Sequence, residues 1–331
     1  MNIPPYFNTK KLETFYRVPY LERAEDAREW KEKYDITPSS TDKEKVALLL
    51  IDVQNTFCLP EFELYVGGRS GRGAIEDNVR LCEFIYKNLG KITSIFPTLD
   101  THAALQIFHP LFWVDAEGHH PTPSTIIQAN EVRTGKWKVS PRATTKDISH
   151  EELSKYALHY VEKLAKDEKY PLIIWPYHAM QGGIGHALVS SVEEAIFFHS
   201  IARSSKVHME IKGDNFLTEN YSVLAPEVRD DHNGKTIATK NTAFVETLLT
   251  YDKIIIAGQA KSHCVAWTID DLLSEIRTRD PLLAEKVYLL DDCSSAVVIP
   301  GVVDFTDDAE RAYERFADAG MNRVTTDNFT L

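Results

Sequence analysis

One stretch decides the fold of this chain: Ile254-Ile255-Ile256-Ala257-Gly258-Gln259-Ala260-Lys261-Ser262-His263-Cys264-Val265. The run of isoleucines is typical of a strand that is buried on both faces, as the strands of a parallel sheet are. Gly258 ends this strand, and a tight turn then brings Cys264 to the beginning of the next helix. We expect the other strands and helices to be arranged around this unit.

The thiol of Cys264 is a candidate nucleophile. A helix N-terminus carries partial positive charge and unpaired N–H groups, which favour a thiolate and can bind an oxyanion. Small buried cysteines, however, are usually inert packing residues. The interpretation therefore depends on polar partners elsewhere in the chain.

The composition is that of a globular protein with an excess of acidic groups. The 331 residues include 37 basic and 49 acidic side chains, and the net charge of −12 argues against nucleic acid or an anionic membrane as a partner. No apolar run is long enough to span a bilayer, and no signal-peptide pattern is present, so we expect a cytoplasmic protein. The cysteine spacing indicates neither a zinc knuckle nor a disulfide framework: Cys58, Cys82, Cys264, Cys293.

Strand-like apolar runs alternate with helical segments along most of the chain. This alternation predicts an α/β fold, a three-layer α/β/α arrangement around a doubly wound parallel sheet. Residues 1–44 are predicted to form an N-terminal arm whose aromatic side chains pack on the body or on a neighbouring subunit, with a partly disordered tail as the alternative. Residues 45–331 form the main domain, with an insertion at about 110–170. The predicted strands cover residues 45–51, 92–98, 172–174, 207–211, 253–257, 286–290 and 323–325.

Polar residues follow several of these strands directly. In a parallel α/β sheet the carboxyl ends of the strands lie at one edge, where functional groups gather. Each residue alone has an ordinary explanation: an aspartate can cap a turn, and a lysine at a strand end is usually on the surface. An Asp and a His two positions apart suit a small metal-binding cluster. Together they predict one site, made of Asp52, Asp100-Thr101-His102, His178, Lys212 and Cys264.

These residues resemble the motifs of the nicotinamidase and isochorismatase-like cysteine hydrolases. The matching segments occur in the order of that family and cover most of residues 45–331, outside the arm and the insertion. They are Ile51-Asp52-Val53-Gln54-Asn55-Thr56-Phe57, Asp100-Thr101-His102, Trp175-Pro176-Tyr177-His178, Lys212-Gly213 and Gly258-Gln259-Ala260-Lys261-Ser262-His263-Cys264-Val265.

The resemblance implies a catalytic triad of Asp52, Lys212 and Cys264. Asp52 would take the thiol proton, Lys212 would hold positive charge beside the thiolate, and Cys264 would attack an amide carbonyl to form a thioester. The backbone N–H groups of Ala260 and Cys264 would bind the oxyanion. The family also implies a cis peptide bond between Gln259 and Ala260.

The nicotinamidase branch further implies a divalent metal ion, zinc being the first choice. Its ligands would be Asp100, His102 and His178, with His109 as a candidate fourth ligand. The metal would coordinate the pyridine nitrogen of nicotinamide and place the amide over the thiol. The isochorismatase branch generally lacks this ligand set. The resemblance also implies that Phe57 and Trp175 line the substrate pocket.

The sequence departs from the family near the expected pocket. Ala179 and Gly183 stand where Cys and Thr are usual, Lys261-Ser262 replaces Thr-Asp, and a long insertion, often a lid, falls between His109 and Trp175. Nicotinamide is therefore the leading substrate of an amidohydrolase, and another small amide or ureido compound is the alternative. A third hypothesis is a non-catalytic ligand-binding protein. We also expect a homo-oligomer.

Overall fold

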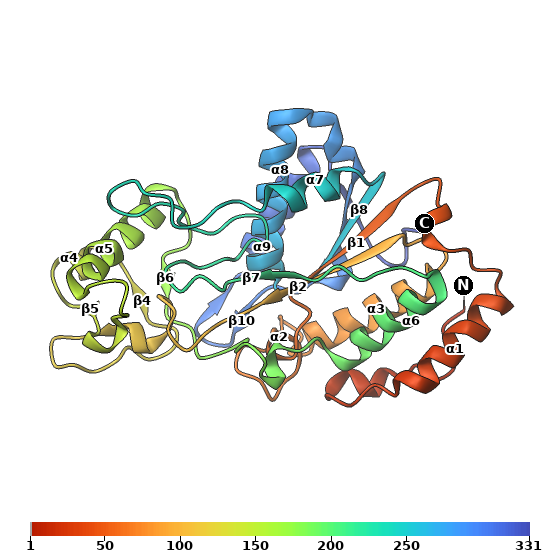
Figure 1. Ribbon diagram of the computed structural model, residues 1–331, viewed down its shortest axis with the longest axis horizontal. Coiled ribbons are helices and arrows are strands. Elements are labelled where there is room, and N and C mark those ends of the chain that lie inside the picture. The colour runs from red at the N-terminus through yellow and green to blue at the C-terminus, as the bar shows by residue number, and fades with distance from the viewer. Residues whose placement is uncertain (1) are drawn as a thin grey trace.

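The structure, a computed structural model, describes residues 2–331 of the chain. Its centre is a six-stranded sheet with the spatial order β12 (Asn322–Val324), β9 (Val287–Leu290), β8 (Lys253–Gly258), β1 (Val46–Ile51), β2 (Ser94–Asp100) and β7 (Glu210–Lys212) (Figure 1). Neighbouring strands of this sheet pair in parallel. The predicted α/β fold with a doubly wound parallel sheet is confirmed.

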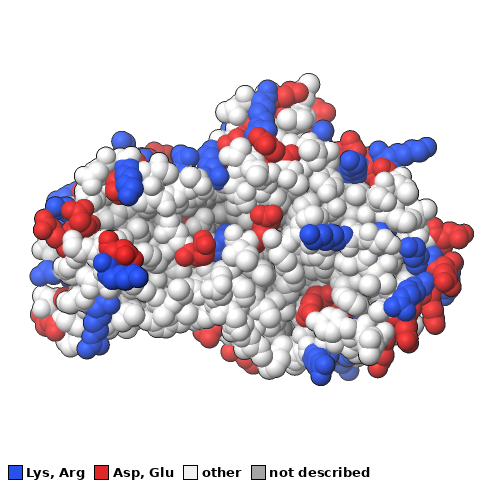
Figure 2. All heavy atoms as spheres, in the orientation of Figure 1, with Lys and Arg blue, Asp and Glu red and all other residues white. Residues whose placement is uncertain are grey.

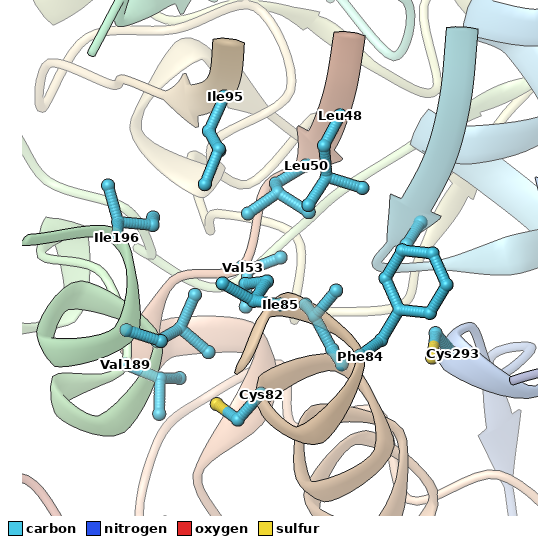
Figure 3. Packing of buried hydrophobic residues seen from close by; sticks show 14 of the residues in the cluster. Leu48, Leu50, Val53, Cys82, Phe84, Ile85, Ile95, Val189, Ile196 and Cys293 are labelled. Atoms are coloured by element: carbon cyan, nitrogen blue, oxygen red, sulfur yellow. The ribbon is translucent and has the colours of Figure 1, made fainter. Parts of the chain in front are cut away.

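The helices cover both faces of the sheet (Figure 1). Strand β1 is buried along its whole length, because its side chains alternate between two apolar clusters. Leu48 and Leu50 point toward α3 (Gly73–Lys87) and α6 (Ser190–Arg203), where Figure 3 shows them beside Ile85 and Ile196. The alternate residues of β1 face the cluster formed with α7 (Thr242–Leu249), α8 (Ala266–Arg279) and α9 (Thr306–Asp318).

The N-terminal residues lie against the body of the same chain. Helix α1 (Tyr20–Lys33) packs along α6, and its Ala27 and Trp30 belong to the core cluster of that side. Arg23 of α1 forms an ion pair of 3.0 Å with the buried Glu194 of α6. Helix α1 of the N-terminal segment therefore lies against the body of the same chain.

The inserted segment forms a lobe at the end of the molecule opposite both termini (Figure 1). The lobe has its own apolar cluster, in which Tyr156 and Tyr160 of α5 (His150–Lys166) pack with Phe112 and Trp113. Its other elements are β3 (Trp113–Val114), β4 (Ile126–Ile127), α4 (Ala129–Arg133) and β5 (Lys138–Val139).

One predicted strand does not belong to the central sheet. The apolar run at 172–174 forms β6 (Leu172–Ile173), which pairs antiparallel with β4 of the lobe. The run is short, and the Trp175-Pro176 step that follows cannot continue a ladder because proline has no N–H. The prediction of a central strand at 172–174 was therefore wrong.

Three features that the composition bears on are the surface charges, the apolar length of the helices and the state of the cysteines. On the face shown in Figure 2, acidic and basic side chains are interspersed. None of the helices in residues 2–331 is long and apolar enough to cross a membrane. All four cysteines are free and buried, as expected for packing residues at Cys58, Cys82 and Cys293.

Candidate active site

The register of the sheet brings the predicted site residues to one edge. Ile51 pairs with Gly258, and Asp100 pairs with Lys212, so the carboxyl ends of β1, β8, β2 and β7 lie side by side. Asp52 follows β1, and the turn with Cys264 follows β8. Four segments that are far apart in the sequence thus meet at this edge.

The ammonium group of Lys212 lies at the centre of the site. Its Nζ is 2.9 Å from Asp52 Oδ2, 2.9 Å from Asp100 Oδ1 and 3.6 Å from Cys264 Sγ. It also donates to the carbonyl oxygen of Asn220 at 2.8 Å. Burial acts to lower the pKa of this amine, but the two carboxylates outweigh burial and raise the pKa well above its usual range. Lys212 is therefore a buried, permanently charged group and not a surface lysine.

Asp52 is held in place by Thr98. The Thr98 hydroxyl donates to Asp52 Oδ1 at 2.5 Å and accepts the Asp52 backbone N–H at 3.0 Å. Burial raises the pKa of the Asp52 carboxyl, although Lys212 opposes this effect. Asp52 and Cys264 both contact the Lys212 ammonium group, at 2.9 Å and 3.6 Å, and the charge of Asp52 raises the pKa of the thiol. A carboxylate with a raised pKa beside a thiol can act as its proton acceptor.

Cys264 lies in a π-helical turn, Lys261–Val265, which leads into α8. Such turns often occur at functional sites. Burial raises the pKa of the thiol well above its usual value, Lys212 lowers it, and Asp52 and Asp100 add to the increase. Burial thus opposes the thiolate that a helix N-terminus favours, and the thiolate depends on Lys212 and on a nearby base for its formation.

The predicted oxyanion segment borders the cavity. Ala260 and Cys264 both line it, and the peptide bond between Gln259 and Ala260 is cis, as the resemblance implied. The side chain of Gln259 is anchored by a 2.8 Å hydrogen bond to Asp77 Oδ2.

Three imidazoles gather beside the triad. Ligand atoms of His102, His109 and His178 all lie within 4.8 Å of one another. His178 Nδ1 lies 2.7 Å from the carbonyl oxygen of Pro176, and His102 Nδ1 lies 3.2 Å from that of His178. The buried His109 Nε2 has no hydrogen-bond partner among the described residues. Burial lowers the pKa of His109 to about 4, so its imidazole is neutral and can act as a ligand.

Asp100 connects the imidazoles to the triad. Its Oδ1 contacts Lys212 and lies 3.1 Å from His102 Nε2, while Oδ2 lies 3.8 Å from His178 Nε2. A Cβ on Gly213 would lie 2.8 Å from Asp100 Oδ1 and 3.0 Å from His102 Nε2, so glycine leaves this space open. Three imidazoles, an unpartnered ring nitrogen and a nearby carboxylate form a donor set that fits zinc or a similar divalent ion. Of the predicted ligands, the structure places His102, His109 and His178 close enough to one another to share one metal ion. That Asp100 is also a ligand stays a prediction.

A cavity of about 420 Å³ opens above these groups. Asp100, His102, His178 and Cys264 lie on its wall, and Phe57 and Trp175 line it as predicted. The other residues of the lining are Glu63, Leu64, Tyr65, Val66, Phe108, Pro123, Ser124, Pro176, Glu219, Asn220, Tyr221, Ala260, His263, Val297, Val298 and Ile299.

Several residues of the site were not found from the sequence. Gln54 lies inside the motif that contains Asp52, and Thr98 lies just before the motif that begins at Asp100. These places in the sequence are the signal that could have indicated a positioning role for both side chains. Gln54 accepts from the backbone N–H of Asp100 and donates to its carbonyl oxygen, both at 2.8 Å. Glu219 lies in an irregular segment without a periodic pattern, and no sequence signal indicates that it reaches the cavity.

The fold is similar to that of solved nicotinamidases. A nicotinamidase and pyrazinamidase from Acinetobacter baumannii is 17% identical, with 87% of this chain and 99% of that chain covered and a TM-score of 0.51. The yeast nicotinamidase bound to the inhibitor nicotinaldehyde is also 17% identical, with 85% and 99% covered and a TM-score of 0.52. The chain has the nicotinamidase fold. No family model and no curated protein matches the sequence.

Proposed function

We propose that this chain is a cysteine amidohydrolase that converts a small amide to its acid and ammonia, with nicotinamide as the leading candidate. The observation that carries the proposal is the contact of Lys212 Nζ with both Asp52 Oδ2, at 2.9 Å, and Cys264 Sγ, at 3.6 Å, below a cavity. A cysteine that only fills space in the core does not require a buried carboxylate and a buried ammonium group beside it, and burying such charges is costly.

The reaction uses groups that already touch one another. Asp52 accepts the proton of the Cys264 thiol, and the sulfur attacks the amide carbonyl carbon. Lys212 stabilises the negative charge that develops on sulfur, and the backbone N–H groups of Ala260 and Cys264 hold the oxyanion. When the C–N bond breaks, the amine takes the proton from Asp52 and leaves as ammonia. Asp52 then accepts a proton from water as the water oxygen attacks the thioester carbonyl carbon. When the C–S bond breaks, the acid is released and Asp52 returns the proton to the sulfur, which restores the thiol.

His102, His109, His178 and Asp100 would hold a divalent metal ion, with zinc as the first choice. The bound ion would supply a Lewis acid that coordinates a ring nitrogen of a heteroaromatic amide. Phe57 and Trp175 provide apolar walls for such a ring. These features favour nicotinamide among the small amides.

The size of the cavity favours a second candidate, a larger amide. At about 420 Å³ the cavity falls in the range of roughly 300–1,000 Å³ that proteins use for drug-sized ligands. Of the lining residues, none is Lys or Arg, so the cavity walls suit a neutral or cationic molecule better than an anion.

The test is ammonia release from nicotinamide and from a panel of larger amides and ureido compounds. Activity should disappear in Cys264→Ala and fall after treatment with a chelator, whereas Cys293→Ala, which removes a thiol outside the cavity, should remain active. Silence across the panel, together with a Cys264 that resists alkylation, would favour a ligand-binding protein without catalysis. The expected small-molecule partner, cytoplasmic location and homo-oligomer stay predictions.

A further inference from the structure

Glu219 is a buried acid on the cavity wall that the hydrolytic steps do not use. Its residue is 4% exposed and lines the same cavity as Cys264. The indole N–H of Trp175 donates to Glu219 Oε1 at 3.0 Å, and the Tyr160 hydroxyl donates to Oε2 at 3.3 Å. Both carboxyl oxygens thus act as acceptors, and each keeps further lone-pair capacity.

No cation neutralises this carboxyl group among the described residues. Lys169 pairs with Glu227 at 3.2 Å, and no ion pair within residues 2–331 includes Glu219. Burial, and after it the charge of Glu227, raises the pKa of Glu219 to about 8, although hydrogen bonds with Tyr221, Trp175 and Tyr160 lower it. At pH 7 the carboxyl group is therefore mainly neutral before a ligand binds, and a donor or cation brought by a ligand stabilises its charged form, in which both oxygens are acceptors.

The other acids of the cavity differ from Glu219. Asp100 already has the Lys212 ammonium at 2.9 Å, and Glu63 is exposed to solvent at the rim. Of the three carboxyl groups on the wall, Glu219 is therefore the buried one without a cation.

The position of Glu219 is fixed from two sides. The Tyr160 hydroxyl also accepts the Glu219 backbone N–H, at 3.2 Å, so this tyrosine of α5 clamps both the main chain and the side chain. The next residue, Asn220, accepts a hydrogen bond from Lys212 at 2.8 Å. The inserted lobe and the triad thus hold one acid in a set position relative to the nucleophile, as a preorganised recognition group requires.

We propose that Glu219 binds a hydrogen-bond donor that the substrate carries apart from its scissile carboxamide, so that the preferred substrates are amides bearing an amino, ammonium or N–H group. This inference rests on the proposed amidohydrolase function and names its substrate class. A site built around a buried acceptor rejects an analogue that lacks the donor, because the acceptor is then left unpaired.

The experiment compares amino-substituted with methyl-substituted nicotinamides at ring positions 5 and 6, with the methoxy analogues as acceptor-only probes. At one of these positions the wild-type kcat/KM should favour the amino over the methyl compound by about tenfold or more. In Glu219→Leu the ratio should fall to near one, and in Glu219→Gln, which keeps an acceptor for Trp175 and Tyr160, it should lie between. Glu63→Gln, which changes the exposed acid at the rim, should keep the wild-type ratio.

Three outcomes would overturn the inference. The wild-type enzyme could have equal kcat/KM values for the amino and methyl compounds, it could prefer the methoxy to the amino compound, or the preference for the amino compound could persist in Glu219→Leu. Calorimetry separates this result from a failure of the proposed function. In a Cys264→Ala background, where no turnover is needed, the amino analogue should bind about tenfold or more tightly than the methyl analogue, and Glu219→Leu should abolish the difference. Equal binding of the two analogues, or binding of none of the probes, would also overturn it.

Discussion

Replacement of Lys212 by methionine should expose how much the site depends on one buried charge. Lys212 is 3% exposed, and its ammonium group lies 2.9 Å from a carboxyl oxygen of both Asp52 and Asp100. At an effective dielectric constant of about 20, each contact is worth about 6 kcal/mol of Coulomb attraction, which is offset in the wild type by the cost of burying the three charges. Methionine keeps the length and apolar stem but removes the charge.

The variant is left with two buried carboxyl groups and no cation. Removing one partner of a buried ion pair typically costs about 3–5 kcal/mol in the free energy of unfolding, and we expect a loss of that size at pH 7. The loss should shrink as the pH falls toward 5. Without Lys212 the folded-state pKa of each carboxyl group rises above its unfolded value, so protonation relieves the repulsion in the folded state.

The assay is urea denaturation at pH 7 and pH 5, with ammonia release measured on the same samples. Lys253→Met, which removes the partly exposed pair between Lys253 and Glu44 at 2.8 Å, is the matched control and should change the free energy of unfolding by about 0.5 kcal/mol or less. The reasoning is refuted if Lys212→Met is within about 1 kcal/mol of wild type at pH 7, or if its deficit grows as the pH falls.

Three further predictions concern the base, the thiol and the metal. Thr98→Val removes a hydrogen bond that lowers the pKa of Asp52, so kcat/KM should fall by about tenfold or more and its acid limb should move to higher pH; an unshifted profile would contradict this. Because burial raises the pKa of Cys264, iodoacetamide should modify it slowly at pH 7 and faster at higher pH, yet before the three cysteines outside the cavity, as peptide mapping will show. His178→Ala should lower the bound zinc per chain, measured by mass spectrometry, whereas the exposed His119→Ala should not; a wild-type protein that binds no zinc would count against the site.

The strands of the sheet were predictable because they are continuous apolar runs. Burial on both faces leaves no polar alternation, so residues such as Val46–Ile51 can hardly be surface segments. A polar residue directly after such a run must lie at the edge of the sheet, which located Asp52, Lys212 and the Cys264 turn. The run at 172–174 was assigned to the wrong sheet, because a segment of three apolar residues does not indicate its pairing partner.

The chemistry of the site depended on packing. The sequence by itself determined which residue types reach the edge of the sheet, since the positions of the strands and the residue at which each one ends follow from the hydrophobic pattern. Only the tertiary structure decided that the surroundings of the thiol raise its pKa, because desolvation and the nearby carboxylates act through space. The same holds for Glu219, which reaches the cavity wall from an irregular segment and is held there by Tyr160 of the inserted lobe. Local pattern determines where a chain is strand or helix, whereas electrostatic environment and side-chain contacts arise between residues that are distant in the sequence.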